Sequence, residues 1–137
     1  MKNITLVLWL FVLGCAKNEE SIIPYVPINF NAPLNDPRLL KIKTPGGAIV
    51  LTGYGYAGLI LYNSGSGIMA YDACSTVNPE KKCAVTLDEL MISVTDPCSG
   101  AKFFLSDGSA AKAPAQRPLR RYQASFSNNN NSISVIN

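Results

Sequence analysis

The chain has 137 residues, of which 47% are hydrophobic and 15% charged, and its formal net charge at pH 7 is +3. It contains no histidine, which excludes Ser-His-Asp and Cys-His catalytic pairs and every histidine-ligated zinc, copper or haem site. No run of Lys and Arg is dense enough to predict nucleic-acid binding. The length predicts one domain with a short extension.

The N-terminal segment has the features of an export signal. Lys2 precedes an apolar run over residues 4–14. This run is too short to cross a membrane, which takes about 20 apolar residues, but it has the length of a signal-peptide core. It ends in Val12-Leu13-Gly14-Cys15, which resembles a bacterial lipobox. The resemblance implies cleavage before Cys15 and lipid attachment to its thiol. A secretory signal cleaved elsewhere is the alternative.

We therefore expect a signal peptide at residues 1–14, a lipid-anchored tether at 15–23 and one domain at 24–137. A bacterial lipoprotein carries a diacylglyceryl group and usually an N-acyl chain, and two or more acyl chains hold a protein stably on a membrane. Ala16 follows the cysteine, in place of the Asp that commonly retains lipoproteins at the inner membrane. Residues 17–20 resemble the charged signals that send some lipoproteins to the cell surface. The expected location is the cell envelope, anchored at the outer membrane.

The rest of the chain has the pattern of short strands between turns. Prolines keep residues 21–37 extended, with an edge strand at 28–31. Runs of β-forming residues separated by Gly, Asn and Asp predict eight further strands, at 39–43, 48–52, 59–62, 68–71, 91–94, 102–105, 120–126 and 133–136. No twelve-residue segment has a helical apolar period, and we expect one helical turn at 87–91. The pattern predicts an all-β sandwich or barrel.

One motif is misleading. Residues 53–58 match G-x-G-x-x-G, and Asp72 follows at the distance of a ribose contact. Dinucleotide binding needs a helix after the glycines to receive the pyrophosphate. Residues 59–62 have a strand pattern instead, so we interpret the glycines as a bend between strands.

The region from residue 70 to 122 resembles the Rieske domain. That family carries C-x-H-x-G-C, then C-P-C-H-G-x-x-F, a D-G turn, and a proline loop of the form G-P-A-x-x-P-L-x-x-Y. Here Cys74-Ser75-Thr76, Asp96-Pro97-Cys98-Ser99-Gly100, Asp107-Gly108 and Ala113-Pro114-Ala115-Gln116-Arg117-Pro118-Leu119-Arg120-Arg121-Tyr122 follow in the same order. The resemblance implies an antiparallel Rieske-like β-sandwich with two disulfide-stapled tip loops and a proline loop.

The resemblance fails at the metal ligands. A Rieske [2Fe–2S] centre has two Cys on one iron and two His on the other. Cys74 matches one ligand, but Thr76, Asp96 and Ser99 stand at the other three positions. We therefore expect a degenerate cluster site with no metal and no cofactor.

The remaining cysteines imply a disulfide. Cys83 and Cys98 fall where the family's two non-ligand cysteines pair, and an exported protein meets an oxidising compartment. A Cys74–Cys98 bond is the alternative. Two other possibilities are a Cys₃Asp metal site that includes Asp96, and a thiol–disulfide enzyme that uses Cys74. The chain has no C-x-x-C motif for either.

Together these features predict a cluster-free Rieske-like lipoprotein with no catalytic residues. It would act as a binding or structural module at the bacterial envelope. Its partners would be the membrane, through the lipid, and an envelope protein or small ligand, but not nucleic acid. The alternative function is electron transfer by a Rieske ferredoxin-type protein with an atypical iron–sulfur site.

Overall fold

The computed structural model describes residues 22–137, so the expected signal peptide and Cys15 lie outside the described residues. Ten strands and two short 3₁₀ helices make up this part of the chain. They are β1 (Asn29–Pro33), η1 (Pro37–Lys43), β2 (Ala48–Leu51), β3 (Leu59–Asn63), β4 (Ile68–Asp72), η2 (Pro79–Lys81), β5 (Thr86–Leu87), β6 (Ser93–Thr95), β7 (Lys102–Phe104), β8 (Ala110–Lys112), β9 (Arg121–Ser127) and β10 (Ser132–Ile136). Within residues 22–137, none of the helices has the length and apolar character needed to cross a membrane.

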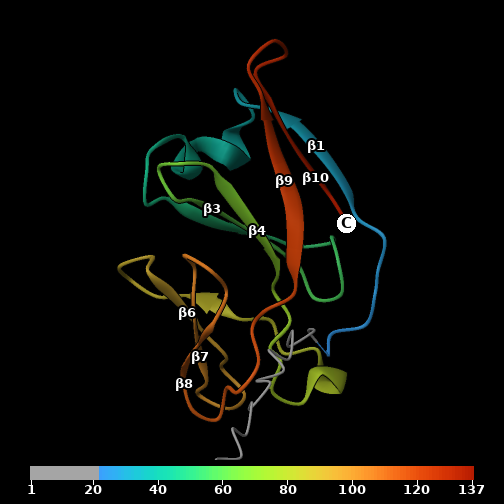
Figure 1. Cartoon of the computed structure of the whole chain (residues 1–137), viewed down its shortest axis with the longest axis vertical. Helices are drawn as coiled ribbons and strands as arrows, with labels where there is room; N and C mark the ends of the chain where they lie inside the picture. Colours follow the sequence, from blue (N-terminus) through green and yellow to red (C-terminus); the bar gives the residue numbers. More distant parts are fainter. Residues whose placement is uncertain (1–21) are drawn as a thin grey trace, which may run out of the picture.

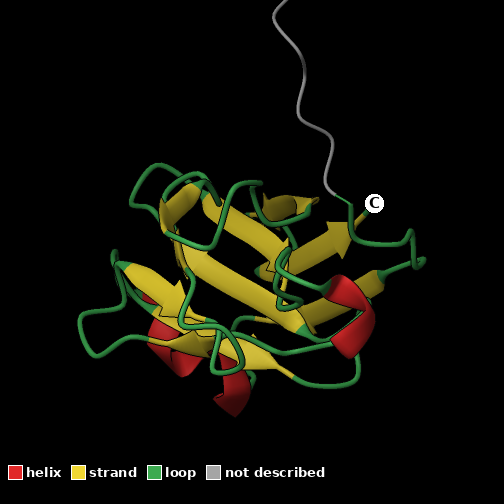
Figure 2. Cartoon of the chain, turned by 90° about the horizontal axis from the view of Figure 1, so that it is seen from below, coloured by secondary structure: helices red, strands yellow, loops and turns green. Residues whose placement is uncertain are grey.

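The strands form two antiparallel sheets, which confirms the all-β prediction. The larger sheet has the order β1-β10-β9-β4-β3-β2, and the smaller one has the order β5-β6-β7-β8 (Figure 1). β10 pairs along its whole length with residues 123–127 of β9, whereas the first two residues of β9 pair with β4. Because β9 changes partner along its length, the larger sheet curls. Seen from below, the strands lie in stacked layers (Figure 2).

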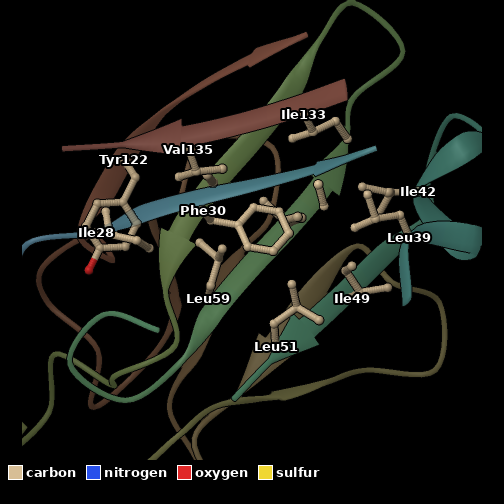
Figure 3. Packing of buried hydrophobic residues seen from close by; sticks show 13 residues of the cluster. Ile28, Phe30, Leu39, Ile42, Ile49, Leu51, Leu59, Tyr122, Ile133 and Val135 are labelled. Atoms are coloured by element: carbon tan, nitrogen blue, oxygen red, sulfur yellow. The ribbon is translucent and has the colours of Figure 1, made fainter. Parts of the chain in front are cut away.

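The middle layer is β3 and β4, because apolar side chains on both of its faces are buried. Leu59 and Leu61 belong to a cluster inside the curled sheet, built around Phe30 (Figure 3). Ile60 and Tyr71 point to the opposite face and pack with the small sheet. A strand buried on both faces has a continuous apolar sequence, as the run over 59–62 does.

The strand expected at residues 39–43 is wrong, because this segment lies in η1. The carboxylate of Asp36 accepts a hydrogen bond from the Arg38 N–H, and Pro37 occupies the first turn. Leu39 and Ile42, three residues apart, are both buried on the same side of the helix. A spacing of three is the period of a 3₁₀ helix. The helical turn expected at 87–91 is also wrong, since the 3₁₀ helices of the described chain lie elsewhere.

Three loops gather at one end of the molecule, the lower end in Figure 1. We name them tip loop 1 (residues 72–83, after β4), tip loop 2 (95–101, between β6 and β7) and the proline loop (111–119, between β8 and β9). The sheets fix where each loop begins and ends. The residues expected at the degenerate site therefore lie close together, on tip loops 1 and 2.

Candidate functional site

A disulfide joins the two tip loops. It links Cys83 to Cys98, fifteen residues apart, with the Cα atoms 6.3 Å from each other. This is the pairing that the Rieske resemblance implied. The alternative Cys74–Cys98 bond is absent, and Cys74 is a free, buried cysteine. The N–H of Ser75 also donates to the Cys83 carbonyl at 2.9 Å, which closes tip loop 1 on itself.

The free thiol of Cys74 points into the protein. Its Sγ lies 3.4 Å from the carbonyl oxygen of Ser75 and 3.6 Å from that of Pro79. Burial raises the pKa of the thiol to about 12, and the nearby carboxylates of Asp72 and Asp96 act in the same direction. A nucleophilic cysteine needs a lowered pKa and access to solvent. Cys74 has neither, so the geometry argues against a thiol–disulfide enzyme.

Thr76 ties tip loop 1 to the proline loop. Its hydroxyl donates to the backbone carbonyl of Arg117 at 2.8 Å, and the residue is only 6% exposed. Thr76 is one of the two positions where the Rieske pattern has a histidine ligand. Here the side chain bonds another part of the protein.

Asp96 and Ser99 also bond to the protein itself. Asp96 is buried, and its carboxylate accepts from the Cys98 N–H at 2.8 Å and from the Ser99 hydroxyl at 2.5 Å. The Ser75 side chain of tip loop 1 lies near this carboxylate and also favours its charged form. Burial alone would raise the pKa of Asp96, but these hydrogen bonds outweigh it and hold the pKa below its ordinary value. The Asp96 carboxylate is therefore held by hydrogen bonds within tip loop 2, beside the disulfide that joins the two tip loops.

A second buried carboxylate lies at the base of tip loop 1. Asp72 has no exposed surface. It accepts hydrogen bonds from the backbone N–H groups of Tyr56, Ala57 and Cys74, at 2.5, 3.1 and 2.8 Å, and from the Tyr122 hydroxyl at 2.6 Å. Four donors on one carboxylate satisfy the requirement that a buried polar group be hydrogen-bonded.

The two carboxylates share one local pattern that the sequence interpretation missed. In both Asp72-Ala73-Cys74 and Asp96-Pro97-Cys98 the Asp side chain accepts from the N–H of the cysteine two residues later, at 2.8 Å in each case. Asp side chains commonly bond the backbone two residues on. The repeated D-x-C was the signal available in the sequence, and it marks both tip loops.

Two tyrosines in the glycine-rich bend make contacts within the domain. The Tyr54 ring packs edge-on against Phe30, with the ring centroids 5.1 Å apart. The Tyr56 ring lies under the ammonium group of Lys82, 4.5 Å from its centroid. Tyr54 therefore belongs to the core packing, and Tyr56 helps to hold tip loop 1.

No protein-family model matches the chain, and no curated protein matches it. Solved structures do. The cyanobacterial plasma membrane Rieske protein PetC3 from Synechocystis PCC 6803 superimposes with a TM-score of 0.53 at 23% identity, over 82% of this chain and 99% of that one. The ferredoxin of carbazole 1,9a-dioxygenase from Nocardioides aromaticivorans IC177 gives 0.51 at 16% identity, over 81% and 97%.

The chain has a Rieske-like fold. This confirms the resemblance drawn from the loop motifs, together with the antiparallel sheets and the disulfide between the tip loops. At these identities the likeness concerns the fold alone. Whether this fold can bind an iron–sulfur group in this chain depends on the residues of the tip loops.

Those residues do not fit a Rieske [2Fe–2S] group, which needs two cysteine and two histidine ligands. The chain has no histidine. Cys83 and Cys98 are bonded to each other, and Cys74 is the one free thiol of the described chain. Cys83, Cys98 and Asp96 do lie close enough to form a metal-binding group. However, the two sulfurs of that group are the disulfide, and metal ligation needs thiolates.

Proposed function

We propose that this protein is a cluster-free Rieske-like lipoprotein that acts as a binding or structural module at the bacterial envelope. One observation carries the proposal. The side chains at the degenerate ligand positions form hydrogen bonds within the protein. The Thr76 hydroxyl donates to the proline loop, and the Ser99 hydroxyl donates to Asp96. Hydrogen bonds and one disulfide connect the loops that a metal cluster would otherwise join.

The anchor belongs to the proposal as well. Lipidation of Cys15 and a location at the outer membrane rest on the sequence at residues 1–20. An oxidising compartment is consistent with the Cys83–Cys98 disulfide, because such bonds persist in exported proteins and are rare in the cytosol.

The proposed contact surface is the outer side of the tip loops and the proline loop. These loops are fixed to each other by the disulfide and by the Thr76 hydroxyl, which donates to the backbone carbonyl of Arg117. Rigid scaffolds commonly present their binding residues on such loops. An envelope protein or a small ligand is the partner we propose, and nucleic acid is not.

A second function has its own support. The two solved structures described above are a Rieske protein and a ferredoxin by name, so electron transfer through an atypical iron–sulfur site is the rival proposal. It requires iron bound by a donor set other than Cys₂His₂. Cys74 and Asp96 would have to supply part of that set, and both would first have to give up their present hydrogen bonds.

Iron analysis separates the two proposals. The full-length protein should be expressed with its signal and purified anaerobically from membranes, and its iron content and visible absorption should then be measured. We expect no stoichiometric iron and no charge-transfer bands. About two irons per chain with those bands would overturn the cluster-free proposal. A matched positive control is the variant Thr76→His/Asp96→Cys/Ser99→His, which restores the Rieske ligand types at the degenerate positions.

A further inference from the structure

The start of the described chain lies at the same end of the molecule as the three loops. The carbonyl oxygen of Ile23 accepts a hydrogen bond from the guanidinium group of Arg120 at 2.9 Å. Arg120 directly follows the proline loop, and its carbonyl accepts from the N–H of Asp72, where tip loop 1 begins. Ile23 is 2% exposed, and the Tyr25 ring lies 5.3 Å from the Arg120 guanidinium carbon. The chain is therefore fixed to the domain at its lower end in Figure 1.

The proposed tether is short compared with the domain. Seven residue-to-residue steps separate Cys15 from Ile22, and a fully extended chain covers at most about 25 Å over that number. A compact domain of this size is about 35 Å across. A lipid on Cys15 would therefore keep the tip loops near the bilayer. The opposite end, which carries η1 and the β9–β10 turn (Figure 1), cannot turn toward it without a longer tether.

The surface that faces the bilayer in this arrangement is basic. Tip loop 1 carries Lys81 and Lys82, and the proline loop carries Lys112 and Arg117; all four are exposed. None of these four is in an ion pair among the described residues, and the Lys82 ammonium group, which lies over the Tyr56 ring, keeps its positive charge there. The exposed acid of the three loops is Glu80, while Asp72 and Asp96 are buried. Bacterial phospholipid surfaces that contain phosphatidylglycerol are anionic, and cationic side chains near such a surface are attracted to it.

We infer that the membrane holding the anchor is itself the partner of the tip: Lys81, Lys82 and Arg117 rest on anionic phospholipid headgroups. This inference rests on the proposed function, whose lipid anchor and contact surface it uses. A lipid anchor with a basic patch gives two membrane signals on one end of the domain. The tip loops then contact the bilayer, and the opposite end of the domain faces away from the membrane.

Lysine footprinting tests this orientation within one molecule. The lipidated full-length protein is reconstituted in vesicles of phosphatidylethanolamine and phosphatidylglycerol, acetylated briefly, and compared with the same protein in detergent micelles by mass spectrometry. We expect acetylation of Lys81, Lys82 and Lys112 to slow at least three-fold. Lys41 and Lys43 in η1 are also exposed but lie out of the tether's reach, so their rates should not change.

Two comparisons strengthen the test. The variant Lys81→Gln/Lys82→Gln/Arg117→Gln should lose the protection of Lys112, while the matched variant Lys41→Gln/Lys43→Gln should keep it. Vesicles of phosphatidylcholine alone, or high salt, should also reduce the protection, because salt screens exposed charges.

The outcomes are distinguishable from those of the iron analysis. An equal change in acetylation rate at both ends of the domain, or slower acetylation of Lys41 and Lys43 alone, would contradict a membrane-facing tip. The cluster-free proposal would not be affected by either result. An N-terminal mass showing that Cys15 carries no lipid would overturn both the anchor and this inference. Stoichiometric iron together with protected tip lysines would overturn the cluster-free proposal alone.

Discussion

The hydroxyl of Tyr122 donates to the carboxylate of Asp72 at 2.6 Å, and both residues are buried. Tyr122 lies in β9 and Asp72 ends β4, at the point where the two strands pair. This bond joins the two halves of the curled sheet at the base of tip loop 1.

We expect Tyr122→Phe to destabilise the fold. The substitution removes one of four donors from a buried carboxylate, and a hydrogen bond to a charged group contributes about 1.5–3 kcal/mol. Chemical denaturation of both proteins gives the difference. Tyr25→Phe is the matched control, because Tyr25 is 63% exposed and its hydroxyl makes a long 3.4 Å contact with Asn137. Equal midpoints for Tyr122→Phe and the wild type would contradict the proposed role of the bond.

The glycine-rich bend explains how the backbone reaches Asp72. Gly55 has φ +65°, and a Cβ atom there would lie 2.5 Å from a carboxylate oxygen of Asp72 and 2.7 Å from the Tyr122 hydroxyl oxygen. Its absence lets the N–H groups of Tyr56 and Ala57 approach the carboxylate. The G-x-G-x-x-G sequence therefore does surround an anion, which is the chain's own Asp72.

Gly55→Ala and Gly53→Ala form a matched pair that tests this role. Gly53 has φ +86° with nothing within 4 Å of an added Cβ. Alanine there should therefore lower the free energy of unfolding only through the strain of a left-handed backbone conformation, by about 1–2 kcal/mol. Alanine at Gly55 adds overpacking against Asp72, worth about another 1–3 kcal/mol. Thermal unfolding should rank the wild type first, Gly53→Ala second and Gly55→Ala last. Similar losses for the two variants would show that the close approach to Asp72 contributes nothing.

The sequence predicted the fold where its signals are local or belong to a known motif order. Most strand positions follow from β-forming runs between turns, and the Cys83–Cys98 pairing is what the resemblance to the Rieske motifs implied. η1 was mistaken for a strand because it has only seven residues. Its period of three is shown by just two buried residues, Leu39 and Ile42, which is too few to identify a helix. The two-residue strand β5 is too short to show any period.

The polar network at the site could not be predicted in the same way. Asp72 bonds to Tyr122, 50 residues away, and to Tyr56, 16 residues away. Such partners depend on the strand register. The Thr76 hydroxyl likewise donates to a loop that comes close only in the folded chain. The sequence was enough to predict that the metal ligands are absent. The hydrogen-bond partners of the side chains that replace them could be found only in the structure.

Removing the disulfide should weaken the fold. The bond closes fifteen residues of chain, and the chain-entropy model gives about 3 kcal/mol for such a loop. We expect Cys83→Ser/Cys98→Ser to lose an amount of this order in urea denaturation. Reductant should destabilise the wild type to a similar extent and leave the double variant unchanged. Cys74→Ala is the control and should keep its sensitivity to reductant. A reductant effect that disappears in Cys74→Ala would instead place Cys74 in the bond.

The buried thiol predicts a loss of stability in alkali. Burial raises the pKa of Cys74 from 9.0 to about 12 in the folded protein, so above pH 9 the unfolded chain releases a proton that the folded chain keeps. Stability is therefore full below pH 9 and falls toward pH 12. Tyr71, with its pKa raised to about 12 by burial, adds to the same decline. The unfolding free energy of Cys74→Ala should fall less steeply across this range, and parallel curves for the two proteins would contradict the assignment.

Ser99→Ala should have the opposite pH signature. Hydrogen bonds, the one from Ser99 foremost, hold the pKa of Asp96 below its ordinary value against the effect of burial. The resulting stability is present above about pH 4 and is lost as the pH falls through the folded-state pKa. Ser99→Ala should cost about 1.5–3 kcal/mol at pH 7, as for a hydrogen bond to a charged group, and should make the decline in acid shallower.

Ser109→Ala is the matched control for Ser99→Ala. Ser109 also donates to an aspartate, at 2.7 Å, but its partner Asp107 is exposed, where water can replace the lost hydrogen bond. The expected change is within about 0.5 kcal/mol at any pH, as for most surface substitutions. Unfolding curves of both variants and the wild type at pH 7 and pH 3 give the loss of unfolding free energy for each substitution. If the two serine variants lose the same stability at pH 7, the hydrogen bond from Ser99 does not stabilise the Asp96 carboxylate.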